Sequence, residues 1–159
     1  MTVLPGLPGR LWIAAPCAAQ LHQRLTDHIP QQRGAVTQLG HAFTVLRLSG
    51  PKAAEVLARD LAVDLHPSQF PSGSVALTSI QDVSVTLHRV RDLGGSAMYD
   101  LYLPRGFARA LFERLCHTAQ GFATSSRVER LPASAAWQPA FRANETRAGL
   151  LPPRPRPIC

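Results

Sequence analysis

The sequence predicts an α+β fold, a two-layer sandwich in which about three helices pack on a mainly antiparallel, ferredoxin-like sheet. Two kinds of segment point to it. Some are rich in β-forming side chains, and those at 43–48 and 83–90 alternate with the period of a strand that has one buried face. Others, at 51–61 and 107–115, repeat apolar side chains every three or four positions, as a helix that covers a sheet does.

The stretch 43–67 joins these two kinds of element. After the strand at 43–48, Gly50 permits a tight turn into a helix that begins near Pro51, where a helix tolerates proline. We expect the side chain of Ser49 to accept hydrogen bonds from the free amides of this helix.

A loop and further strands follow the helix. Residues 63–73 contain two prolines and are expected to form a loop, with Phe70 as its anchor in the core. We predict strands at 74–80 and 97–103, and a hairpin turn at Gly94-Gly95.

The N-terminal third predicts smaller elements. We expect short strands at 11–14 and 35–39. Between them, Pro16 is placed to open a helix whose apolar face carries Leu21, Leu25 and Ile29, and which Pro30 ends.

The chain divides into three parts by composition. Residues 1–9 hold two Pro-Gly steps and are predicted to be irregular. Residues 10–118 are predicted to form a single α+β domain. Residues 119–159 are rich in Ala, Ser, Arg and Pro, so we predict a disordered tail with at most a short helix at 133–141.

The net charge of +7 raises the question of nucleic-acid binding. Six arginines and only two acidic residues lie after residue 118, which leaves +3 for the first 118 residues. Much of the positive charge therefore belongs to the predicted tail, which argues against a strongly basic face on the folded domain.

Cysteine use and hydropathy indicate the compartment. Cys17, Cys116 and Cys159 are too few and too scattered for a disulfide framework or a metal site. No run approaches the roughly 20 apolar residues of a membrane span, and the apolar run after Arg10 is too short for a secretion signal. We expect a cytoplasmic protein.

No arrangement of residues points to catalysis. The sequence has no Gly-x-Gly-x-x-Gly, Gly-x-Ser-x-Gly or phosphate-binding loop, and its acidic residues are scattered. Asp64 is the acid most worth following, and even there a hydrogen bond to its own turn is the favoured interpretation. We predict no catalytic, cofactor-binding or metal-binding residue, and structural roles for Gly50, Pro51, Asp64 and Phe70.

Several phrases, in order, resemble the gamma subunits of heterotetrameric sarcosine oxidase over about three-quarters of the chain. They are Leu11-Trp12-Ile13; Val45 through Pro51; Ala54 with Leu57; Asp64-Leu65-His66-Pro67 with Phe70 and Gly73; Ala76-Leu77-Thr78; and Arg105-Gly106-Phe107-Ala108. The resemblance implies a fold similar to part of the folate-binding domain of aminomethyltransferases. It also implies an accessory, non-catalytic subunit of a complex that oxidatively demethylates sarcosine to glycine.

The resemblance implies partners and cofactors as well. The partners would be large flavoprotein alpha and beta subunits and a small zinc-containing delta subunit. FAD, FMN and NAD would belong to those partners, with tetrahydrofolate as a co-substrate of the complex and hydrogen peroxide among its products. The alternative is a stand-alone α+β domain that binds RNA or a folate-like ligand.

Overall fold

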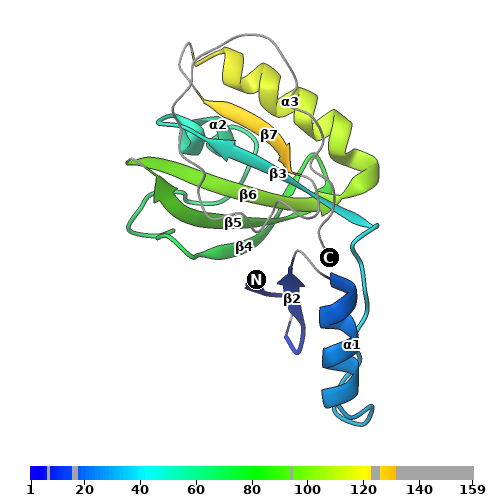
Figure 1. Cartoon of the computed structure of the whole chain (residues 1–159). Coiled ribbons are helices and arrows are strands. Elements are labelled where there is room, and N and C mark those ends of the chain that lie inside the picture. Colours follow the sequence, from blue (N-terminus) through cyan, green and yellow to red (C-terminus); the bar gives the residue numbers. More distant parts are fainter. Residues whose placement is uncertain (7, 16–17, 94, 123–125, 132–159) are drawn as a thin grey trace.

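A computed structural model of the chain describes residues 1–6, 8–15, 18–93, 95–122 and 126–131 (Figure 1). Within them, the helices are α1 (Ala18–His28), α2 (Ala53–Ala58) and α3 (Ala108–Gln120), with a 3-10 turn at Arg105–Phe107 before α3. The strands are β1 (Thr2–Pro5), β2 (Leu11–Ala14), β3 (Phe43–Ser49), β4 (Val75–Ile80), β5 (Val83–Leu93), β6 (Ser96–Pro104) and β7 (Arg127–Leu131).

Five strands form one sheet in the order β4-β5-β6-β3-β7, and each neighbouring pair is antiparallel. Strand β3 lies between β6 and β7, so α3 connects β6 to β7 across the intervening strand β3. The predicted α+β class and antiparallel sheet are confirmed. From β3 onward the chain runs β-α-β-β-β-α-β, one strand more than the ferredoxin-like pattern.

One face of this sheet is apolar, and α2 and α3 cover it. Leu46 lies opposite Leu101, and Leu101 lies opposite Leu87, so three neighbouring strands place leucines in one row. These side chains pack with Leu57 of α2 and Leu115 of α3 in a single buried cluster. Figure 1 shows α3 lying along this layer of the fold. The alternation of the strands thus places their apolar sides under the apolar stripes of the helices.

The loop between α2 and β4 closes one side of this cluster. Phe70 is buried there, which confirms its predicted role as the anchor. The buried guanidinium of Arg89, on β5, donates a hydrogen bond from Nη1 to the Phe70 carbonyl oxygen at 2.7 Å. The Gly73 amide in turn donates to the Arg89 carbonyl oxygen at 2.7 Å. The loop is therefore fixed both by apolar packing and by hydrogen bonds to a sheet strand.

The turn between β3 and α2 follows the prediction for Gly50 and departs from it for Ser49. Gly50 has φ of +131°, a conformation that other residues rarely adopt. Ser49 is not the helix cap. It belongs to the sheet, paired with Met98 and Arg127, and Lys52 precedes α2 without a capping side-chain hydrogen bond.

The predicted irregular N-terminus, residues 1–9, contains a strand. Strand β1 pairs with the predicted strand at 11–14, which is β2, in a two-stranded antiparallel sheet. The Pro-Gly steps supply the turn: Gly9 has φ of +75°, and the Gly6 amide donates to the Arg10 carbonyl oxygen at 3.0 Å. The Pro-Gly steps thus form the predicted turns, and these turns connect two strands.

Trp12 of this hairpin packs edge-to-face on Phe43 of the main sheet, with ring centroids 4.9 Å apart. Leu4, on the same side of the hairpin as Trp12, is buried. The predicted first helix is present as α1. The prediction of a strand at 35–39 is wrong. Those residues form no regular structure, and Leu39 is exposed.

The predicted start of the tail, at residue 119 of the range 119–159, is too early in the chain. Helix α3 continues to Gln120, and β7 pairs with β3 over five residues. The pairing covers an edge of β3 that would otherwise lie unpaired, and Val128 packs against the core. Residues 132–159, with the helix expected at 133–141, lie outside the described residues.

Replacing Phe70 by alanine should lower the free energy of unfolding by about 3 kcal/mol, because the change leaves a cavity in the core. Urea unfolding of the two proteins measures the difference. Phe107→Ala is the matched control: Phe107 is 50% exposed, so its loss should change stability by less than about 0.5 kcal/mol. An equally small loss for Phe70→Ala would contradict its role as an anchor.

Candidate functional site

The face of the sheet opposite α2 and α3 carries a buried ion pair. Arg47 of β3 and Asp100 of β6 are direct cross-strand neighbours. Arg47 Nε and Nη2 donate to the two carboxylate oxygens at 2.6 and 2.7 Å, and the Asp100 side chain is only 2% exposed. This two-point geometry is the strongest form of arginine–carboxylate contact. The hydrogen bond to Asp100 raises the pKa of Arg47, although burial opposes the shift.

Two titratable side chains flank this ion pair. His88 of β5 lies opposite Asp100, and Tyr102 is two residues farther along β6. Burial lowers the pKa of His88; Asp100 opposes this shift and Arg47 adds to it. Burial also raises the pKa of Tyr102, with a further contribution from Asp100. Both side chains are therefore held in their neutral forms at neutral pH. Glu129 of β7 lies opposite Arg47 in the sheet and also raises the pKa of Arg47.

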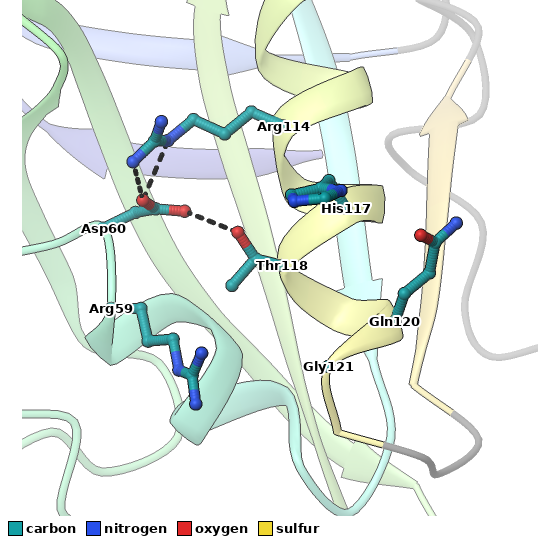
Figure 2. Close-up of a pocket in the computed structure, with 7 residues that line it drawn as sticks. All are labelled: Arg59, Asp60, Arg114, His117, Thr118, Gln120 and Gly121. Atoms are coloured by element: carbon teal, nitrogen blue, oxygen red, sulfur yellow. Dashed lines mark hydrogen bonds and ion pairs between the residues drawn. The ribbon is translucent and has the colours of Figure 1, made fainter.

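A second polar cluster lies where α2 ends beside α3. An open pocket of about 460 Å³ is present there, lined by Arg59, Asp60, Arg114, His117, Thr118, Gln120 and Gly121 (Figure 2). Arg114 Nε and Nη2 donate to Asp60 Oδ1 at 2.8 and 2.6 Å, and Thr118 Oγ1 donates to the other carboxylate oxygen at 3.4 Å. Arg59 places its guanidinium over the ring of Phe122, 4.5 Å from the centroid.

The chemistry available in this pocket is limited. Both oxygens of Asp60 accept hydrogen bonds from neighbours, so the carboxylate is occupied by partners on α3 and is not directed at an incoming group. Figure 2 shows Arg114 and Thr118 turned toward Asp60, while the other lining side chains do not converge on it. Asp60 and Arg114 instead join the end of α2 to α3.

The structure places the residues chosen from the sequence at separate points. Asp64 accepts a hydrogen bond from the His66 amide at 2.9 Å, which is the turn that was predicted for it. Gly50 and Phe70 occupy the turn and the anchor already described, and Pro51 is exposed before α2. None of these four residues belongs to the pocket or to the ion pair on the sheet.

The sequence did not predict that Arg47 pairs with Asp100, or that Asp60 pairs with Arg114. The only signal was a charged residue inside each of two apolar strands, Arg47 in 43–48 and Asp100 in 97–103. The register that brings them together depends on how β3 and β6 pair, which separate segments do not reveal.

Among the described residues, no three His, Cys, Asp or Glu side chains gather where they could hold a metal ion. Cys116 is partly buried on α3, and burial raises the pKa of its thiol, which disfavours the reactive thiolate. No helix in the described part of the chain is long and apolar enough to cross a membrane.

The model of the GCVT N-terminal domain family matches residues 9–126, about three-quarters of the chain. The chain belongs to the GCVT N-terminal domain family. The match extends from the end of the first hairpin turn to the residue before β7. This GCVT domain therefore includes every strand of the five-stranded sheet except the edge strand β7.

Two relatives refine the comparison. Sarcosine oxidase subunit gamma of Corynebacterium sp. strain U-96 is 34% identical over 82 residues, which is 52% of this chain and 40% of the relative. The same subunit of strain P-1 is 33% identical over 82 residues, with the same coverage. The predicted resemblance to gamma subunits is therefore confirmed, although the matched region spans only two-fifths of these relatives.

A solved structure gives a similar result. A chain of the heterotetrameric sarcosine oxidase from Corynebacterium sp. U-96, crystallised with pyrrole 2-carboxylate, superimposes with a TM-score of 0.61 and 26% identity. The superposition covers 67% of this chain and 52% of that chain. Together with the GCVT family match, this superposition confirms the aminomethyltransferase-like fold that the resemblance implied.

The buried ion pair predicts a large effect of a small change. Asp100→Asn leaves the Arg47 cation buried opposite a neutral group and should cost about 3 kcal/mol in the free energy of unfolding, measured with urea. Glu113→Gln is the control, because Glu113 pairs with Arg109 on the exposed side of α3 and should contribute less than about 0.5 kcal/mol.

The double replacement Arg47→Met with Asp100→Leu should recover most of the stability, because it removes both charges together. If Asp100→Asn were as stable as the natural protein, the ion pair would not support the sheet.

Proposed function

We propose that this chain is an accessory, non-catalytic gamma-type subunit of a heterotetrameric sarcosine oxidase. The complex would oxidatively demethylate sarcosine to glycine, with formaldehyde or methylene-tetrahydrofolate and hydrogen peroxide as the other products. The observation that carries the proposal is the similarity of both sequence and fold to chains of that complex.

The side-chain arrangement supports an accessory role. Catalysis requires a nucleophile beside a base, or an acid and base with access to a substrate. Here Asp100 and Asp60 are each occupied by an arginine, and His88 and Tyr102 are neutral and partly buried on the sheet. Each charged cluster links two elements of the fold, which is what a structural pair does.

The proposal assigns the chemistry to other chains. FAD, FMN and NAD would be held by the large alpha and beta subunits and zinc by the small delta subunit, with tetrahydrofolate as co-substrate of the assembled enzyme. We propose that the assembly is cytoplasmic.

Co-expression of the tagged chain with the other sarcosine oxidase chains of its source organism tests this function. We expect flavin-containing chains to co-purify with it, and hydrogen peroxide to form when sarcosine is added to the complex. The purified chain alone should produce none.

Two results would contradict the proposal: a chain that stays monomeric beside those partners, or sarcosine turnover by the chain alone. A gel shift of RNA that weakens steeply with salt, or saturable binding of tetrahydrofolate by the isolated chain, would favour the stand-alone alternative.

A further inference from the structure

The exposed apolar side chains are unevenly distributed. Among the described residues, eight large hydrophobic side chains are exposed, and six of them precede β3. They are Met1, Val3, Leu11, Ile13, Ile29 and Leu39. The other two, Leu77 and Phe107, lie on separate elements of the main domain. Single exposed hydrophobic residues are ordinary on a protein surface, whereas a group of them marks a site of contact.

The hairpin presents several of these side chains on one face. In its register Val3 lies opposite Ile13 and Pro5 lies opposite Leu11, so these residues point to the same side. Leu4 and Trp12 point to the other side, where Leu4 is buried and Trp12 contacts Phe43. We call the first side, made of Val3, Pro5, Leu11 and Ile13, the hairpin face.

The hairpin face is apolar and lacks charge. Arg10, in the turn, is the only Lys, Arg, Asp or Glu among the first 23 residues. The centre of a protein–protein contact is depleted of charge in the same way. A membrane surface is a poor fit, because peripheral membrane segments combine an apolar side with several basic residues. The complementary surface is therefore uncharged and belongs to a protein.

Helix α1 is also largely exposed to solvent. Among the residues of α1 whose exposure is described, Ala19 to His28, none is buried, and Leu21 and Leu25 are only partly covered. Figure 1 shows α1 and the hairpin projecting from the five-stranded sheet. An isolated two-stranded sheet is marginally stable in water, and so is an isolated helix of 11 residues. Elements of this size become stable by packing against a larger surface.

We infer that the hairpin face is the surface through which this chain docks on a larger neighbouring subunit, which supplies an uncharged apolar patch. The inference rests on the proposed function, since the similar solved chain comes from a heterotetramer, and the occupant is accordingly another kind of chain. The covered hairpin and α1 would then be ordered by assembly.

Charge placed on the hairpin face tests the inference. Leu11 is 71% exposed and Val3 is 49% exposed, so Leu11→Glu and Val3→Glu should leave the fold of the free chain intact. Each variant should weaken binding to the co-expressed partner chains by about tenfold or more, because a charge is buried against an apolar surface. Circular dichroism and urea unfolding of the isolated variants check the fold.

Leu77→Glu is the matched control. Leu77 is 51% exposed on β4, an edge strand like β1, but it lies on the main sheet. The Leu77→Glu variant should bind the partners as the unchanged chain does. If all three variants bound the partners equally well, the inference would be overturned and the proposed function would stand. The same holds if Leu77→Glu lost as much binding as Leu11→Glu and Val3→Glu.

Two further outcomes are decisive. Failure of the unchanged chain to bind any partner would overturn the proposed function and the inference with it. Self-association of the unchanged chain that Leu11→Glu abolishes, seen by sedimentation, would assign the hairpin face to a second copy and overturn the choice of occupant.

Discussion

Burial of one face of the five-stranded sheet beneath α2 and α3 is the interaction on which the rest of the structure depends. Leu46, Leu101 and Leu87 form a continuous row across three strands, and Leu57 and Leu115 reach this row from the two helices. Burial of a leucine side chain contributes roughly 2 kcal/mol, so a cluster of this kind supplies most of the driving force for folding. The loop around Phe70 and the turn at Gly50 bring the helices and strands into that arrangement.

The charged residues serve the same architecture. Arg47 with Asp100 joins two central strands, Arg114 with Asp60 joins two helices, and Arg89 holds the Phe70 loop. In each case an arginine binds an oxygen of a different element. A buried charge is tolerated only when it is paired in this way, and a paired carboxylate is poorly suited to act as a base. The contacts that stabilise the fold therefore also engage the carboxylates of Asp60 and Asp100.

The structural features that were predicted correctly from the sequence are those that local patterns control. The alternation at 43–48 and 83–90, the glycine turn at Gly50, the Asp64 turn and the Phe70 anchor each depend on a few adjacent residues. The missed features depend on distant ones. Strand β7 forms because β3 has a free edge, and the register of β3 against β6 brings Arg47 to Asp100. The Pro-Gly steps before Leu11 predicted turns, but not the strand β1 that those turns connect to β2.

The chain thus combines a domain that buries its own core with an N-terminal hairpin and helix in which, apart from Leu4, the described side chains are exposed or only partly covered. In the proposed complex, this second part gains its stability from the neighbouring subunit. Hydrogen exchange of backbone amides, measured on the free chain and on the assembled complex, tests this division most directly. Amides of β3, β5 and β6 should be protected in both states, while those of β1, β2 and α1 should exchange rapidly in the free chain and slowly in the complex. Protection of β1, β2 and α1 in the free chain that equals the protection of β3 would contradict the account.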